Sequence, residues 1–341
     1  MSIQRSFSPR RELGRTGFRA TILGIGDLAD RSVPLRDCVA TVRRAMEAGL
    51  NVIDTAPGYE DGYSEQIVGA SLKARRDGMF VIDKIDHMDQ PVAPQVEESL
   101  RRLEMEVVDL LLFHGCSTMA DWRRMAAPGG GMEQLAKCVR AGKCRFRGIS
   151  SHHPGVLRAA IESGLCDVVM FAVGPFCDSR YIEEILPLAR ARGVGTVGFK
   201  TFGAGKLLGD TSGYGRPLDR RPRGVGRDES SAAGKSHLPA GTQGKVGPVH
   251  AGGPPVRARP GADNARPSLP HLSVRQCVHY TLTCDPDVAL LGLSFPDEQD
   301  AAFEAAADFH PLKEDEMARI RELAGEATKG KGPAWWNPQG D

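Results

Sequence analysis

The sequence predicts an α/β fold, a single (β/α)8 TIM barrel, and three observations lead to it. Eight short β-branched runs recur along the chain, helix-patterned segments separate them, and each run is almost continuously apolar. Runs of this kind are typical of parallel strands covered on both faces. A doubly wound open sheet is the alternative, but it requires a G-x-G-x-x-G turn after the first strand, and GIGDLAD does not supply one.

Strands and helices are expected to alternate along the whole chain. The strands are expected at 21–26, 51–56, 79–85, 107–114, 144–150, 167–173, 195–200 and 288–293. The helices are expected at 37–50, 64–73, 93–105, 131–143, 154–164, 179–193, 273–284 and 297–309, with an extra one at 313–327. Ser64 is expected to cap the second helix. We therefore expect one domain over residues 1–341, with its active site at the C-terminal ends of the strands.

One segment, residues 209–271, interrupts this alternation between the seventh and eighth strands. It is rich in Gly, Pro, Arg and Ser, and its few large apolar residues show no period, so it cannot bury enough surface to fold alone. We interpret it as a disordered insertion. A lid over the catalytic end of the barrel and a local reading-frame error remain the alternatives.

Composition and charge narrow the classes of partner. The formal charge of +1 and the absence of a basic stripe with interleaved aromatics argue against nucleic acid, and no stretch has the length of a membrane span. The eight cysteines form no C-x-x-C pair, which argues against a metal site and favours a reducing compartment. We expect a cytoplasmic protein with a small-molecule substrate; the sequence does not indicate an oligomeric state.

Polar residues end three consecutive strands of the predicted barrel. Asp54 closes the second strand, Lys84 the third and His114 the fourth, each thirty residues after the last. Tyr59 follows Asp54 in NVIDTAPGYEDGYSE, on the loop over the same end of the barrel. Because parallel strands of a barrel end at one mouth, these four side chains are expected to converge there.

The chemistry of these four residue types fits together. A tyrosine is a poor proton donor near neutral pH, but a neighbouring lysine ammonium favours its phenolate. An aspartate keeps that ammonium charged, and a histidine can donate a hydrogen bond to a carbonyl oxygen. The set would protonate a carbonyl as it becomes an alcohol, while the hydride must come from a cofactor.

Three segments carry a resemblance to a known family. DTAPGYEDGYSEQIVGASL, the lysine of VIDKI, and SLRRLEMEVVDLLLFH resemble the signature segments of the aldo-keto reductases, and RRELGRTGFRATILGIG resembles their N-terminal hairpin and first strand. The resemblance implies a TIM barrel and an NAD(P)H-dependent carbonyl reductase. It also implies a catalytic tetrad of Asp54, Tyr59, Lys84 and His114, with Tyr59 as the general acid.

The resemblance also suggests residues around the nicotinamide of the cofactor. Ser150 and Ser151 occupy the positions where the family usually has Ser-Asn, and Met170 replaces its usual glutamine. Phe199, after the seventh strand, is expected to stack on the nicotinamide.

The phosphates of the cofactor are expected at two glycine-containing loops. Gly203, Gly205 and Leu207 resemble the family's phosphate loop, and Gly292 and Ser294 follow the eighth strand. The segment after Ser294 is acidic, and Phe303 replaces a usual asparagine. NADPH is therefore the expected cofactor, with NADH as the alternative.

Two other functions remain open. The first is a non-catalytic protein that binds a nicotinamide nucleotide on the same barrel, as a regulatory subunit or a redox sensor; the altered amide contacts keep it open. The second is a barrel metallohydrolase that uses His152 and His153 with Asp54 and His114, although its typical H-x-H on the first strand is missing.

Tryptophans provide two smaller expectations. Trp122 either lines the substrate pocket or packs in a loop. Trp335 and Trp336 are expected to pack the C-terminal tail onto the barrel.

Overall fold

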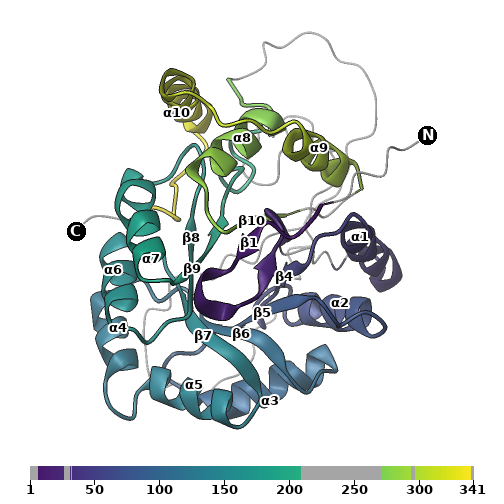
Figure 1. Cartoon of the computed structure of the whole chain (residues 1–341), viewed down its shortest axis with the longest axis vertical. Helices are drawn as coiled ribbons and strands as arrows, with labels where there is room; N and C mark the ends of the chain where they lie inside the picture. Colours follow the sequence, from purple (N-terminus) through teal and green to yellow (C-terminus); the bar gives the residue numbers. More distant parts are fainter. Residues whose placement is uncertain (1–6, 27–30, 32, 209–269, 293–295, 339–341) are drawn as a thin grey trace.

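The computed structural model describes residues 7–26, 31, 33–208, 270–292 and 296–338. Within them, eight parallel strands close into a barrel in the order β10-β3-β4-β5-β6-β7-β8-β9 (Figure 1). The strands are β3 (Leu23–Ile25), β4 (Val52–Asp54), β5 (Phe80–Ile85), β6 (Val108–Phe113), β7 (Cys144–Ser150), β8 (Val168–Ala172), β9 (Gly195–Phe199) and β10 (Val288–Leu291). The (β/α)8 prediction is confirmed, each strand at its expected position, and the open-sheet alternative is wrong.

Helices surround the barrel (Figure 1). They are α1 (Leu35–Glu47), α2 (Tyr63–Leu72), α3 (Val92–Leu103), α4 (Met119–Ala126), α5 (Gly131–Arg140), α6 (Pro154–Glu162), α7 (Leu186–Ala191), α8 (Val274–Cys284), α9 (Pro296–Ala307) and α10 (Glu314–Thr328). A short π-helix, Tyr181–Ile185, precedes α7. The sequence did not predict α4, which carries Trp122 into the core between strands and helices, where it is buried. None of the helices in the described ranges is long and apolar enough to cross a membrane.

The start of α2 corrects one prediction. Gly62 is the capping residue, with a left-handed φ of 81°, and Ser64 lies inside the helix. The Ser64 hydroxyl is buried and accepts a hydrogen bond from the Thr55 hydroxyl at 2.8 Å. Ser64 therefore ties α2 to the residue that follows β4 and caps nothing.

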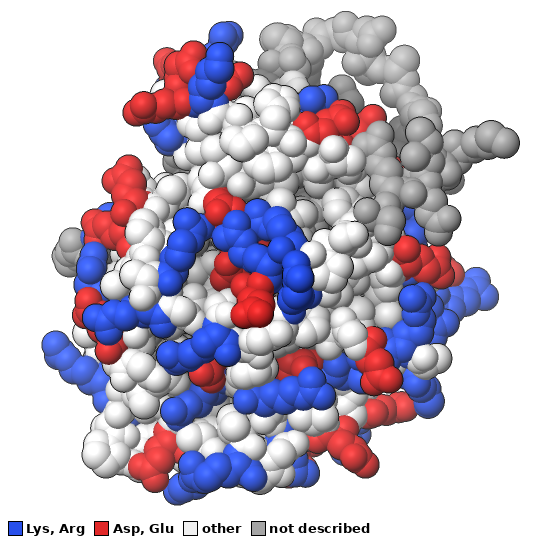
Figure 2. All heavy atoms as spheres, viewed as in Figure 1, with Lys and Arg blue, Asp and Glu red and all other residues white. Residues whose placement is uncertain are grey.

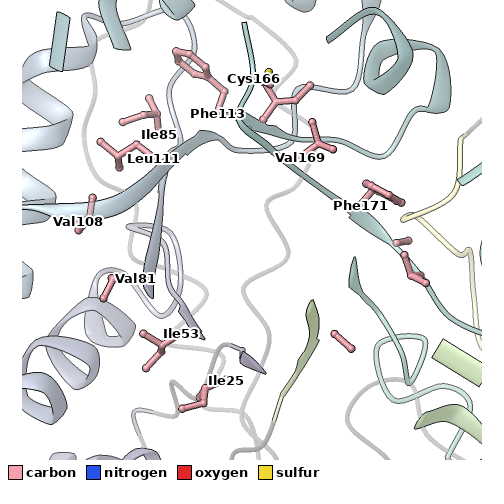
Figure 3. Packing of buried hydrophobic residues seen from close by; sticks show 14 of the residues in the cluster. Ile25, Ile53, Val81, Ile85, Val108, Leu111, Phe113, Cys166, Val169 and Phe171 are labelled. Carbon is pink, nitrogen blue, oxygen red and sulfur yellow. The ribbon is translucent and has the colours of Figure 1, made fainter. Parts of the chain in front are cut away.

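Side chains alternate between two faces along each strand, and each face has its own core. The outer face packs against the helices, and Figure 3 labels residues of this layer, among them Ile53, Val81 and Phe171. The inner face fills the barrel itself. Its residues on the strands are Val52, Phe80, Ile82, Leu110, Leu112, Val168, Met170, Val197, Val288 and Leu290. The near-continuous apolar runs follow from this double burial.

A two-stranded hairpin, β1 (Arg11–Glu12) and β2 (Arg19–Ala20), closes the N-terminal end of the barrel, as the family resemblance implies. Leu13 and Ala20 of this segment belong to the inner core, and the Phe18 ring lies 5.0 Å from that of Phe80. Figure 2 shows this face, where basic and acidic side chains gather over the hairpin. The hairpin plug leaves the opposite, C-terminal end as the mouth.

Two expectations concern residues outside the described ranges. The insertion at 209–271 falls almost wholly on residues 209–269, between β9 and α8. Ser294 lies in the undescribed residues 293–295. The disorder of the insertion and the single domain over 1–341 stay predictions.

Candidate active site

The inner face of β4, β5 and β6 delivers three polar side chains to the mouth. On β4, Asp54 comes two residues after the inward-facing Val52 and therefore lies on the same face. On β5, Lys84 follows the inward-facing Ile82 in the same way. His114 follows β6 directly, and its backbone N–H donates to the carbonyl of Ile85 on β5 at 3.0 Å. The structure thus places all three on adjacent strands, as the thirty-residue spacing predicts.

Asp54 and Lys84 form a buried ion pair. The Lys84 Nζ lies 2.7 and 2.8 Å from the two carboxylate oxygens of Asp54 and 2.7 Å from the carbonyl oxygen of Thr55. Burial by itself lowers the pKa of Lys84, but the charge of Asp54 and the interaction with Tyr59 outweigh it and raise that pKa. Burial raises the pKa of Asp54, against the opposing charge of Lys84. The ammonium is therefore permanently charged and held by three acceptors.

Tyr59 lies over this ion pair. The Lys84 Nζ is 4.5 Å from the centre of the Tyr59 ring. The turn that follows Tyr59 has left-handed φ values at Glu60, Asp61 and Gly62, of 47°, 54° and 81°. Arg31 donates to the backbone carbonyls of Glu60 and Asp61 and holds this turn.

The second tyrosine of the motif serves another purpose. The Tyr63 hydroxyl donates to the carbonyl of Val33 at 3.0 Å, ahead of α1. Tyr59, and not Tyr63, is therefore the tyrosine of the mouth.

His114 completes the group and has a partner that the sequence reasoning missed. Its ring centre lies 5.6 Å from that of Tyr59, with the planes at 83°. Its Nδ1 lies 2.6 Å from Oδ1 of Asp86, on the loop after β5. Burial alone would raise the pKa of Asp86, but the hydrogen bond and charge of His114 outweigh it, so that this pKa is lowered. Asp86 comes two residues after Lys84, so its side chain is expected on the same, inward face. That spacing was the signal available in the sequence.

The two serines after β7 are engaged by neighbouring backbone. The Ser150 Oγ accepts from the N–H of Gly115 at 2.9 Å, and the Ser151 Oγ accepts from the N–H of His153 at 3.2 Å. Both residues are buried beside the mouth. Met170 pairs with Ser150 in the β7–β8 register, within the inner core.

Phe199 ends β9 at the same end of the barrel as the tetrad, and its ring is half-buried. The turn beyond it contains Gly203 and Gly205 at positive φ, 55° and 83°. The N–H of Gly203 donates to the carbonyl of Lys200 at 2.8 Å, and that of Gly205 to Phe202 at 2.9 Å. These amides are thus occupied within the turn, and phosphate binding by them stays a prediction.

The other residues predicted near the cofactor phosphates, Leu207 and Gly292, differ in their exposure to solvent. The Leu207 side chain is buried among α8 and α10, and its backbone N–H and carbonyl bond to Phe202 and Leu272. Gly292 follows β10 and is exposed. Ser294 lies outside the described residues.

The two histidines that suggested a metal site have separate roles. His153 caps α6, and its Nδ1 accepts from the N–H of Gly155 at 3.1 Å. The His152 ring lies 5.4 Å from that of Phe199 and 5.2 Å from that of Trp335. Across the described part of the chain, no three His, Cys, Asp or Glu side chains are grouped to hold a metal.

The C-terminal tail covers one side of the mouth. Trp336 is fully buried, and its Nε1 donates to the carbonyl of Phe176 at 2.7 Å. The Lys206 Nζ donates to the carbonyls of Gly332 and Pro333, and the Lys331 Nζ donates back to the carbonyl of Lys206. The prediction that Trp335 and Trp336 pack the tail onto the barrel is confirmed, with Trp336 fully buried and Trp335 half-buried against the core.

Two further buried carboxyls lie behind Lys84: Asp83 on the outer face of β5 and Glu65 on α2. Asp83 and Glu65 are both completely buried, and each keeps one oxygen without a partner among the described residues. Burial raises the pKa of Asp83, and the charge of Glu65 raises it further. Burial also raises the pKa of Glu65, against the opposing hydrogen bond and charge of Arg102, which lies 3.0 Å away. Burial therefore disfavours the charged form of both carboxyls.

Comparisons with known proteins agree with this arrangement. The model of the aldo/keto reductase family matches residues 21–238. The chain is 28% identical over 222 residues to an L-galactose dehydrogenase of Arabidopsis thaliana and 26% identical over 219 residues to an NADH-specific methylglyoxal reductase of Escherichia coli. Each match covers 58% of this chain and 66% of the relative, so the chain spans just under two thirds of these curated proteins.

Solved structures share the fold. An aldo-keto reductase from Bacillus halodurans, in its holo form, superposes with a TM-score of 0.61 at 23% identity, over 92% of this chain and 95% of that one. An aldo-keto reductase from Klebsiella pneumoniae in complex with NADPH gives a TM-score of 0.60 at 17% identity, over 97% of both chains. At these identities the likeness speaks for the fold, and the family model covers more than half of the sequence. The chain belongs to the aldo/keto reductase family.

Proposed function

We propose that this protein reduces an aldehyde or a ketone to an alcohol with a hydride from NADPH, and that Tyr59 is the general acid. The observation that carries the proposal is the packing of Tyr59 over the buried Lys84–Asp54 pair, with His114 against the same ring. This grouping stands at the C-terminal mouth of a barrel, where enzymes of this fold carry out their chemistry.

The residues at the mouth fit a nicotinamide nucleotide in part. Phe199 offers a half-buried aromatic face at the level of the tetrad, which suits stacking of a planar ring. Ser150 and Ser151 lie beside it, and Gly203, Gly205, Leu207, Gly292 and Ser294 are the proposed residues for the phosphates. When bound, NADPH supplies the hydride. NADH is the alternative donor, since one relative is named for it.

Each side chain of the tetrad has a distinct part in the proposed reaction. The Tyr59 hydroxyl gives its proton to the carbonyl oxygen, and the Lys84 ammonium stabilises the phenolate that remains. Asp54 holds that ammonium in place. His114 points its second ring nitrogen at the carbonyl, because Asp86 occupies Nδ1 and fixes the plane of the ring.

A non-catalytic nucleotide-binding role remains the second candidate. One observation favours it: Met170 stands where an amide contact to the nicotinamide is usual in the family. A protein of this kind would bind the nucleotide and reduce nothing.

Cofactor consumption separates the two candidates. Purified protein is mixed with NADPH or NADH and a panel of aldehydes and ketones, and the absorbance of the reduced nicotinamide is followed. The panel includes methylglyoxal, and the reverse reaction is run with L-galactose and NADP+ or NAD+ as the hydride acceptor, because relatives are named for these compounds. Binding of the cofactor without any turnover favours the second candidate.

The compartment forms part of the proposal. No disulfide joins the eight cysteines, which all lie in the described ranges, and six of them are buried. Free thiols persist in a reducing environment, which supports a cytoplasmic protein acting on a small molecule.

A further inference from the structure

Four side chains from three distant segments meet beside the tetrad. We call His152, Phe199, Lys200 and Trp335 the Lys200 cluster. The Lys200 Nζ lies 4.4 Å from the centre of the Trp335 ring and 5.9 Å from that of Phe199. The His152 ring lies against the same two aromatic rings, at 5.2 and 5.4 Å. The ammonium is therefore framed by rings at the edge of the mouth.

The backbone at Lys200 is held in an unusual conformation. Its φ of 66° is left-handed, a conformation that is unfavourable for an L-residue with a side chain. The carbonyls on either side are fixed: that of Phe199 accepts from Val173, and that of Lys200 accepts from Gly203. The Gly174 backbone is so close that a Cβ there would lie 2.9 Å from the Lys200 carbonyl oxygen. The surrounding loops thus fix the backbone from which the Lys200 side chain extends.

The charge of Lys200 reaches the tetrad and its surroundings. Together with Lys84 and His114, it works against the raising of the Asp54 pKa by burial. Burial, followed by the charges of Lys200 and His114, lowers the pKa of His152 to about 3. His152 is consequently neutral near pH 7, and the positive charge of the cluster resides on Lys200.

Two buried polar atoms next to Lys200 lack a partner among the described residues. They are Nδ1 of His152 and the hydroxyl oxygen of Thr201, the residue that follows Lys200. Thr201 is 1% exposed. Unsatisfied buried polar atoms are rare in folded proteins and call for an explanation, of which a bound polar ligand is one.

We propose that Lys200 binds the carboxylate of the carbonyl substrate, so that the preferred substrates are aldehydes or ketones that carry an acid group. An ammonium beside aromatic rings at the edge of a mouth attracts an anion more strongly than one in water, because the rings exclude part of the solvent. The carbonyl of such a substrate would lie at Tyr59 and its acid group at Lys200. This inference rests on the proposed reductase function.

Phosphate groups of the cofactor present the same anionic chemistry. The first experiment therefore compares two substrates that differ only in charge, benzaldehyde and 4-carboxybenzaldehyde, at saturating NADPH. The ratio of kcat/KM for the charged aldehyde to that for the neutral one is measured for the wild type, Lys200→Met and Lys200→Arg. Lys137→Met serves as the matched control, since Lys137 is an exposed lysine of α5. The dissociation constant of NADPH is measured for each variant.

We expect the ratio to fall by at least about tenfold in Lys200→Met, the size of one hydrogen bond to a charged group. Lys200→Arg should retain part of the preference and Lys137→Met all of it. An unchanged ratio in Lys200→Met overturns the proposal. An unchanged ratio together with weaker NADPH binding also overturns it and assigns Lys200 to a cofactor phosphate.

A second measurement needs no turnover and keeps the inference separate from the proposed function. Benzoate and its neutral analogue benzamide are titrated into the protein, and the intrinsic fluorescence is followed, with Trp335 beside Lys200 as the reporter. Binding of benzoate over benzamide that disappears in Lys200→Met supports the carboxylate site, even if the wild type reduces no aldehyde. Equal responses to both compounds, or benzoate binding that survives Lys200→Met, contradict it.

Discussion

Removal of the Lys84 ammonium tests the buried ion pair most severely. In Lys84→Met, Asp54 remains at 4% exposure without its cation, and the Thr55 carbonyl loses its donor. Loss of one partner of a buried pair costs about 3–5 kcal/mol of the free energy of unfolding. Catalysis should fall by about 10²–10⁴-fold as well, because Tyr59 loses the charge that stabilises its phenolate.

A double-mutant cycle turns this cost into a coupling energy. The variant Asp54→Asn with Lys84→Met buries no unpaired charge, so it should be less destabilised than the sum of the two single variants by about 2 kcal/mol. Urea unfolding followed by circular dichroism gives the four free energies. Additive effects, or a Lys84→Met variant as stable as the wild type, would refute the account of the pair.

The same variant should show a particular dependence on pH. Burial raises the pKa of Asp54, and the Lys84 charge is the largest effect that opposes this rise. Without Lys84, the folded-state pKa of Asp54 should therefore lie further above its unfolded value near ~4. A carboxyl with a raised folded-state pKa costs no stability while it is protonated in both states. Its cost appears as the pH rises above the unfolded pKa and grows up to the folded-state pKa. The destabilisation in Lys84→Met should therefore be smallest in acid.

Three further outcomes are expected. Asp86→Asn leaves His114 without its charged partner and should lower kcat/KM by about tenfold or more, since a hydrogen bond to a charged group is lost; steady-state kinetics that match the wild type would contradict this. Burial raises the folded-state pKa values of Asp83 and Glu65, so the wild type should lose stability as the pH rises above the unfolded pKa near ~4; Asp83→Asn should lose less stability over the same rise in pH, as measured by urea unfolding, and an equal loss would contradict this. Trp336→Ala should cost about 3–5 kcal/mol in the same assay, because it empties a fully buried site; an unchanged midpoint would argue against a docked tail.

The barrel and the convergence of its polar residues could be predicted because both follow from local periodicity. Strands buried on both faces are recognisable as apolar runs, and their C-terminal ends share one mouth whatever fills the barrel. Asp54, Lys84 and His114 could be predicted at this mouth without knowing how distant segments of the chain pack. The tail was predictable from Trp336 for a similar reason, since large aromatic side chains seek burial.

Other features depend on contacts that a single sequence does not display. Serine is a residue type that often caps helices. At α2, however, the left-handed capping position is taken by Gly62, which adopts that conformation without steric cost, and the Ser64 hydroxyl hydrogen-bonds to Thr55 instead. Asp86 meets His114 only through the β5–β6 register, which pairs Ile85 with Phe113. The Lys200 cluster requires the tail, β9 and the loop after β7 together, so no motif in one segment indicates it.

The central claim is that Tyr59 protonates a carbonyl as the cofactor is oxidised. Its most direct test follows reduced-nicotinamide absorbance with wild-type protein and Tyr59→Phe, each given NADPH and an aldehyde from the panel. We predict turnover by the wild type, a loss of at least about 10²-fold in kcat for Tyr59→Phe, and similar NADPH dissociation constants for both. Equal turnover by the two proteins, or cofactor binding by the wild type with no turnover, would contradict the claim.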